Sequence, residues 1–162
     1  GVRLHKRIPA GAGLGGGSSD AAAVLRWAGM GDPRRAVELG ADVAFCLAGG
    51  RARVRGIGEE VEPLEPLERT LTLYTPPLHC STPVVYAEWD RLGGPRGEHG
   101  NDLEPAALSV HPELARWRDE LGDASGQNPR LAGSGSTWFV EGEHPGPGRL
   151  VARTIPSSGP TP

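Results

Sequence analysis

The sequence lacks several features that would place it in a common functional class. It has no excess of positive charge, because 17 Lys and Arg residues stand against 20 Asp and Glu residues and give a formal net charge of −3. No segment has the uniform basic density that nucleic-acid binding requires, so we expect no nucleic-acid partner. A signal peptide and an apolar run of the ~18 residues that a membrane helix needs are both missing, which predicts a soluble, cytoplasmic protein without membrane contact.

Cysteine is also scarce, whereas glycine and proline are abundant. Cys46 and Cys80 show no spacing typical of metal ligands, and we expect both to be reduced core thiols. The 25 glycines and 16 prolines make up a quarter of the 162 residues, which approaches the composition of low-complexity chains. The glycines gather in motifs, however, and 37% of the residues are hydrophobic, so we predict a folded chain of one domain or two small ones.

The most distinctive stretch is a glycine-rich loop that leads into an alanine-rich helix. Five of the seven residues from Gly11 to Gly17 are glycine, and Ser18 and Ser19 follow. The first N–H groups of a helix have no internal partner and lie at the positive end of the helix dipole, so they bind phosphate well. We therefore predict a polyphosphate site here, in preference to a surface turn capped by one of the two serines.

Two well-known phosphate loops fit this stretch poorly. A P-loop requires a lysine after its last glycine, and here Gly17 is followed by serine. The glycines from Gly11 onward match the G-x-G-x-x-G pattern of dinucleotide-binding folds. That fold requires a buried strand before the first glycine, where this chain has Pro9, and Asp32, the acid at the expected distance, lies in a turn. A dinucleotide-dependent oxidoreductase therefore remains only a weaker alternative.

Hydrophobic periodicity and breaker residues predict a series of helices and strands. In chain order, the expected elements are a strand at residues 2–8, helices at 18–28 and 33–39, a strand at 51–55, an acidic connector at 59–68, a strand at 70–74, a helix capped by Thr82 with Pro83 in its first turn, a helix opened by residues 101–105, a helix at 112–121, and strands at 138–140 and 150–155. The helix at 18–28 is apolar on nearly every side, which predicts burial among other elements.

A single acid lies in the apolar run at residues 40–47. A carboxylate beside Val43 and Phe45 is costly to bury unless it is paired or used in chemistry. Asp42 is therefore a candidate catalytic residue. From the residues alone, an Asp that caps a helix or strand by accepting backbone N–H bonds is the somewhat favoured interpretation.

Six motifs, taken in order, resemble one family. They lie at residues 6–23, 40–45, 49–53, 56–59, 101–105 and 131–137. This set is similar to the GHMP superfamily of small-molecule kinases and, within it, to the kinases that phosphorylate the 2-hydroxyl of 4-diphosphocytidyl-2-C-methyl-D-erythritol in non-mevalonate isoprenoid biosynthesis. The resemblance implies an α+β GHMP kinase fold, with a partial ribosomal-S5-domain-2-like N-terminal domain at residues 1–75 and a ferredoxin-like C-terminal domain at 76–162.

The resemblance also implies a set of site residues, with ATP and Mg²⁺ as cofactors. Asp42 takes the place of the catalytic aspartate, although Ala44 replaces a neighbouring proline of the family. The substrate, a cytidine diphosphate-linked methylerythritol, is expected to contact Thr82, Pro83 and Tyr86, with the tyrosine stacking on cytosine. The expected ATP-binding residues are Pro9, Ala10, Gly11, Ala12, Gly13, Leu14, Gly15, Gly16, Gly17, Ser18 and Ser19. The second glycine loop, at 131–137, is expected to pack against the first.

The chain departs from the family pattern in three further places. Family members carry an N-terminal segment with a catalytic lysine and part of the base pocket, and nothing here corresponds to it, so we expect an N-terminally truncated chain. The connection after residue 28 is short, and a helix before residues 150–155 is missing. An inactive nucleotide-binding remnant of the family is therefore a further alternative.

Overall fold

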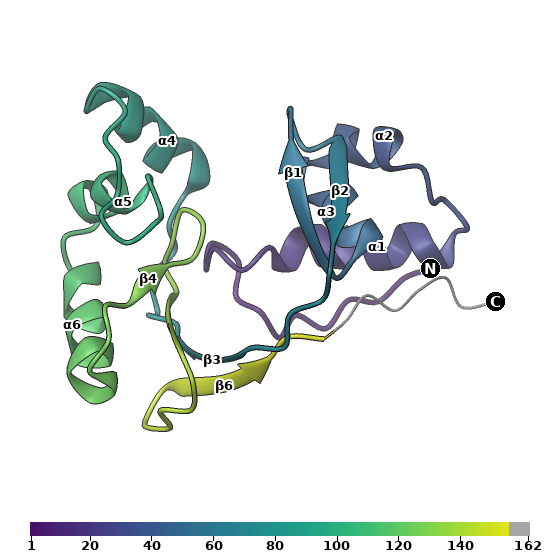
Figure 1. Ribbon diagram of the computed structural model, residues 1–162. Helices are drawn as coiled ribbons and strands as arrows, with labels where there is room; N and C mark the ends of the chain where they lie inside the picture. The colour runs from purple at the N-terminus through teal and green to yellow at the C-terminus, as the bar shows by residue number, and fades with distance from the viewer. Residues whose placement is uncertain (156–162) are drawn as a thin grey trace. The chain divides into compact units, whose positions relative to one another are not determined.

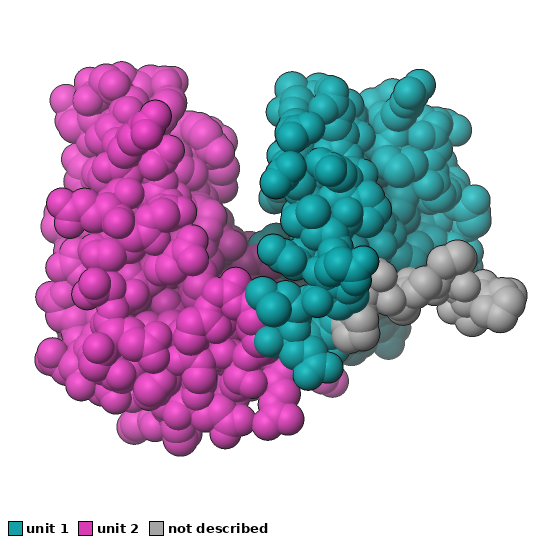
Figure 2. Space-filling model, viewed as in Figure 1, with its two compact units in different colours: residues 1–6, 15–68, 154–162 teal, residues 7–14, 69–153 magenta. Residues whose placement is uncertain are grey.

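The computed structural model describes residues 1–155, which form two compact units (Figures 1 and 2). Within the described residues, unit 1 comprises residues 1–6, 15–68 and 154–155, and unit 2 comprises residues 7–14 and 69–153. The glycine-rich loop is thus divided, with its first half in unit 2 and its second half in unit 1. The end of the C-terminal domain expected at 76–162 lies outside the described residues.

Unit 1 consists of short helices and one hairpin. Its elements are α1 (Gly16–Trp27), α2 (Pro33–Ala36), the 3-10 helix η1 (Val37–Leu39), α3 (Ala41–Ala48), β1 (Arg51–Arg55) and β2 (Glu60–Leu64). The small side chain of Ala22 lets α1 approach α3, where Val43 and Ala44 are buried, and Ala36 of α2 completes this core. β1 and β2 pair antiparallel, with Val54 opposite Val61.

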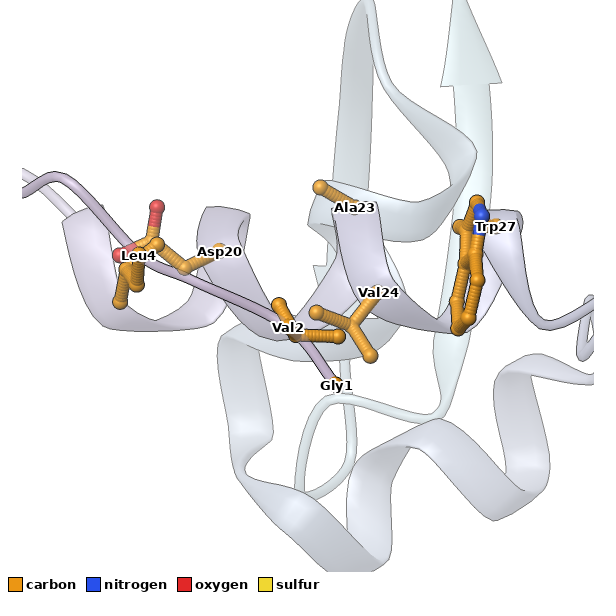
Figure 3. Close-up of a pocket in the computed structure, with 7 residues that line it drawn as sticks. All are labelled: Gly1, Val2, Leu4, Asp20, Ala23, Val24 and Trp27. Atoms are coloured by element: carbon orange, nitrogen blue, oxygen red, sulfur yellow. The ribbon is translucent and has the colours of Figure 1, made fainter.

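Three expectations for unit 1 are wrong. Residues 2–8, of which 2–6 belong to unit 1, form no strand, and Val2 stays exposed. The acidic connector contains β2, whose pairing with β1 no local pattern revealed. Helix α1 is not buried all round: Val24 and Trp27 are exposed and line an apolar hollow of about 410 Å³, together with residues from the start of the chain (Figure 3).

Unit 2 contains an antiparallel sheet and three helices. Its elements are β3 (Thr70–Tyr74), α4 (Thr82–Arg91), α5 (Glu104–Val110), α6 (Leu114–Ser125), β4 (Arg130–Leu131), β5 (Trp138–Glu141) and β6 (Arg149–Arg153). The strands lie in the order β4-β5-β3-β6, and the helices α4, α5 and α6 connect β3 to β4. This arrangement agrees with the ferredoxin-like fold expected for the C-terminal domain. A loop joins β5 to β6, so the family helix before the last strand is missing, as expected.

The core of unit 2 is built from larger side chains. Val85 of α4, Leu114 and Leu121 of α6 and Trp138 of β5 are fully buried and pack together with Cys80. Two expected boundaries shift within this unit. Ser81 rather than Thr82 is the N-cap residue of α4, and α6 begins at Leu114 rather than at residue 112.

The mixed helix and sheet content confirms the α+β class. The compact units change at Glu68 and Arg69, whereas the family domains are expected to meet near residue 75, so the division into domains 1–75 and 76–162 stays a prediction. Among residues 1–155, none of the helices combines the length and the apolar character that a membrane span requires.

Candidate functional site

The start of α1 is an open helix N-terminus. Gly15 is the N-cap residue, with a left-handed φ of 63°, and it provides no side chain to cap the helix. The first intrahelical bond runs from the Ser19 N–H to the Gly15 carbonyl (2.9 Å), so the N–H groups of residues 16–18 precede the helical ladder. These donors and the positive end of the helix dipole favour an anion at this place.

The two serines do not cap the helix. The Ser19 hydroxyl donates to the Gly16 carbonyl (2.9 Å) within the first turn, and Ser18 is half-buried one residue earlier. The interpretation of this stretch as a surface turn capped by Ser18 or Ser19 is therefore wrong. By contrast, the apolar hollow beside α1 has Asp20 as the only charged side chain among its lining residues (Figure 3).

The first half of the glycine loop is held by backbone hydrogen bonds within unit 2. The Gly11 carbonyl accepts from the Cys80 N–H (3.1 Å), and the Ala12 carbonyl accepts from the Thr137 N–H (3.2 Å). Ala12 itself is buried. The second glycine loop, at residues 131–137, therefore packs against the first one, as the resemblance implies.

Gly13 is required by this packing. Its φ is 71°, and a Cβ atom there would lie 2.0 Å from the Ala132 carbonyl oxygen and 2.8 Å from that of Gly135. No side chain fits such a space. This glycine thus serves the contact between the two loops, whereas Gly15, with open space around its Cβ position, leaves the helix N-terminus accessible.

The predicted substrate residues lie on α4 in unit 2. The hydroxyl oxygens of Thr82 and Ser134 are 2.9 Å apart, which places Thr82 at the second glycine loop. Pro83 is exposed in the first turn of the helix. Tyr86 is 51% exposed, so it is not a packed core residue and its ring is open to a stacking partner.

Asp42 lies in the first turn of α3 in unit 1, and its side chain is exposed. The expectation of a carboxylate buried among apolar neighbours is wrong, because the helical turn directs Val43 and Ala44 to the core instead. Gly40 is the N-cap residue, so Asp42 does not cap the helix. One turn later, burial and, to a smaller extent, the charge of Asp42 raise the pKa of the Cys46 thiol.

The turn at residues 56–59 fixes the start of α3, a role that the sequence did not reveal. Gly58 is buried, and a Cβ atom on it would lie 2.1 Å from the Ala41 carbonyl oxygen, directly beside Asp42. The Glu59 carboxylate accepts from the Ile57 N–H (2.7 Å) and closes the turn. The glycines of this motif were visible in the sequence, but their contact with α3 spans some 17 residues and has no local signal.

The two units divide the predicted site residues between them. Unit 1 contains residues 15–19 and Asp42, on two helices, α1 and α3, that pack together. Unit 2 contains residues 9–14 together with Thr82, Pro83 and Tyr86. The arginines of β1 are exposed, and Arg53 and Arg55 lie 3.7 and 4.0 Å from the Glu62 carboxylate on β2.

Comparison with known proteins gives consistent matches. The GHMP kinases N terminal domain matches residues 1–50. The 4-diphosphocytidyl-2-C-methyl-D-erythritol kinase of Paracoccus denitrificans is 39% identical over 85% of this chain and 57% of its own length. The kinase of the same name from Sinorhizobium medicae is 35% identical, over 98% of this chain and 61% of its own length.

A third relative of the same name, from Cereibacter sphaeroides, is 34% identical over 93% of this chain and 70% of its own length. A crystal structure of 4-(cytidine 5'-diphospho)-2C-methyl-D-erythritol kinase superposes with a TM-score of 0.68 at 36% identity, over 88% of this chain and 61% of that one. The chain thus spans 57–70% of the length of these three relatives. From this agreement in sequence and structure, the chain belongs to the 4-diphosphocytidyl-2-C-methyl-D-erythritol kinase family of the GHMP kinases.

Proposed function

We propose that this chain takes part in the ATP-dependent phosphorylation of the 2-hydroxyl of 4-diphosphocytidyl-2-C-methyl-D-erythritol, in the cytoplasm. The observation that carries the proposal is the uncapped N-terminus of α1, which follows a run of left-handed glycines. Family membership supports ATP as the anion that binds there. It also makes the dinucleotide-dependent oxidoreductase an unfavoured alternative.

The glycine loop, residues 9–19, is the proposed ATP-binding segment. The N–H groups of residues 16–18 would bind phosphate oxygens, and the helix dipole adds a favourable charge interaction. Mg²⁺ is bound in such sites mainly through the phosphates and keeps several water ligands. We expect the hydroxyl oxygen of Ser18 or Ser19 beside the ion, because a hydroxyl keeps free lone pairs even when, as in Ser19, it donates its hydrogen to a carbonyl.

Asp42 is the proposed catalytic residue. Its exposed carboxylate would orient the substrate 2-hydroxyl and accept its proton, while the γ-phosphoryl group passes to that oxygen and ADP leaves. Such transfer depends mainly on positioning and charge stabilisation. Gly58, whose close contact fixes the start of α3, would hold this carboxylate in place.

Thr82, Pro83 and Tyr86 are the proposed substrate contacts on α4. The exposed ring of Tyr86 supports stacking on the cytosine base, since aromatic rings stack on every base through their π faces. The Thr82 hydroxyl, paired with Ser134, links the start of this helix to the second glycine loop. Substitution of Tyr86 by leucine is expected to weaken substrate binding without changing MgATP binding.

The test combines a binding measurement with a turnover measurement on the 162-residue chain. Asp42→Asn is expected to lower phosphoryl transfer by about 100-fold or more, because proton acceptance by a positioned side chain contributes that much. MgATP affinity, measured by calorimetry, should stay that of the parent. Glu38→Gln, another exposed acid of unit 1, is the control and should leave both quantities unchanged.

Three outcomes decide between the alternatives. Loss of transfer in Asp42→Asn with retained MgATP binding supports the kinase mechanism. Equal turnover in parent and variant rules out Asp42 as the catalytic residue. MgATP binding by a parent chain that transfers no phosphate supports the inactive nucleotide-binding alternative instead.

A further inference from the structure

Asn101 connects two segments of unit 2 that lie far apart in the sequence. Its side-chain amide nitrogen donates to the Leu131 carbonyl (2.8 Å) and to the Gly133 carbonyl (2.7 Å). Both acceptors belong to the second glycine loop. One NH₂ group thus binds the two carbonyls on either side of Ala132.

Asn101 is itself held rigidly. Its side-chain oxygen accepts from the Leu103 N–H (3.0 Å), and its backbone carbonyl accepts from the Glu104 N–H (3.1 Å) at the start of α5. Gly97 packs so closely against this carbonyl that a Cβ atom there would lie 1.9 Å from the oxygen. The amide group therefore projects from a fixed turn rather than from a mobile loop.

The loop that Asn101 holds is the one that contacts the first glycine loop. Ala132, between the two bound carbonyls, presents its own carbonyl oxygen to Gly13. The Ala132 N–H donates to the Thr137 carbonyl (2.8 Å), and the Thr137 N–H donates to the Ala12 carbonyl (3.2 Å). A shift of the second loop would therefore move the backbone at residues 12 and 13.

We propose that Asn101 is a positioning residue for nucleotide binding, which acts through the second glycine loop on residues 11–13. The inference rests on the proposed function, because it takes the first glycine loop as the ATP-binding segment. Asparagine suits this role because its amide donates two hydrogen bonds while its oxygen accepts another. The oxygen serves the turn before α5 and the nitrogen serves the loop, so the two roles can be tested separately.

Asn101→Asp separates these roles. The variant keeps an acceptor for the Leu103 N–H but replaces the donor nitrogen with a second oxygen, which repels the carbonyls of Leu131 and Gly133. The control is Asp102→Ala in the same turn, which removes only the hydrogen bond to the Gly97 N–H (3.1 Å). For the parent, the variant and the control, amide hydrogen exchange rates and the affinity for MgATP, by calorimetric titration, are measured.

In Asn101→Asp, exchange at the Thr137 and Cys80 amides is expected to rise about tenfold or more, since the two hydrogen bonds from residue 101 to the second glycine loop are lost. The amide of Thr72, which lies opposite Val140 in the β3–β5 pair, should exchange as in the parent. The affinity for MgATP should fall about tenfold in this variant and stay unchanged in Asp102→Ala.

Unchanged exchange at Thr137 and Cys80 in Asn101→Asp overturns the inference, because the amide then does not hold the loops. Faster exchange with unchanged MgATP affinity overturns it as well, because the loops then do not set nucleotide binding. A parent chain that binds no MgATP contradicts the proposed function and the nucleotide role together. In that case the exchange data still decide whether Asn101 holds the two loops.

Discussion

At the scale of single residues, glycines with similar backbone angles serve different purposes. Gly13 and Gly126 have φ values of 71° and 67°, and both lie in unit 2. A side chain at Gly13 would meet the second loop, whereas nothing lies within 4 Å of the Cβ position at Gly126, the residue that ends α6. A pattern of glycines in the sequence cannot distinguish these two cases.

Alanine substitution at the two positions tests this difference. Gly126→Ala is expected to cost only the left-handed backbone penalty, about 1–2 kcal/mol in the free energy of unfolding. Gly13→Ala carries the same penalty and also displaces the Ala132 carbonyl, so its loss should be larger by about 1–3 kcal/mol. Denaturant unfolding followed by circular dichroism measures both values. Equal losses would contradict the close contact between the loops.

At the scale of elements, a carboxylate links α4 to α5. Glu88 accepts two hydrogen bonds from Arg91 on its own helix (2.7 Å each) and one from the Ser109 hydroxyl on α5. The hydrogen bonding with Arg91, which has the largest effect, and the bond from Ser109 lower the pKa of Glu88 from 4.5 to about 2. Because the pKa is lowered on folding, the stabilising contribution is present above pH 4.5 and is lost as the pH falls toward 2.

We therefore expect Glu88 to titrate near pH 2 in an NMR titration of its side-chain carboxyl carbon. Arg91→Gln should raise this pKa toward its ordinary value. Ser109→Ala should raise it by a smaller amount, because the Ser109 hydrogen bond lowers the pKa less than Arg91 does. A midpoint for the parent close to that of a free glutamate would show that the Arg91 and Ser109 hydrogen bonds do not form in solution.

At the scale of the whole molecule, the two units have cores of different quality. Three of the four buried core residues of unit 1 are alanines, at positions 22, 36 and 44, whereas unit 2 buries Trp138 and several leucines within the described residues. Stability follows the apolar area removed from water, so unit 1 should be the weaker unit.

We expect two unfolding steps in a guanidinium titration followed by hydrogen exchange, with amides of unit 1 exposed first. Val43→Ala should lower the first step by about 2 kcal/mol, because it removes two buried carbon atoms. Leu121→Ala should lower the second step by about 2–5 kcal/mol. Coincident transitions in which either substitution affects all amides equally would show that the units unfold together.

Local patterns in the sequence determined the family, through the order of its glycine motifs, and most of the regular elements. The helix after the glycine loop, the strand at residues 51–55 and the strands at 70–74 and 138–140 were all predicted, because alternation and breaker residues act over a few positions. The same local reading placed Tyr86 on a helix and Asp42 at a candidate site, but not their exposure.

Tertiary structure alone decided which residues meet. In the folded chain, residues 2–8 pair with none of the described strands, and an acidic stretch forms β2 by pairing with β1. One face of α1 is open, and Asp42 lies at the surface. The tertiary structure also placed the carbonyl of Ala132 against Gly13 and the amide of Asn101 against the second loop. These contacts join residues separated by about 30 to 120 positions, where no periodicity connects the partners, and only the packed backbone brings them together.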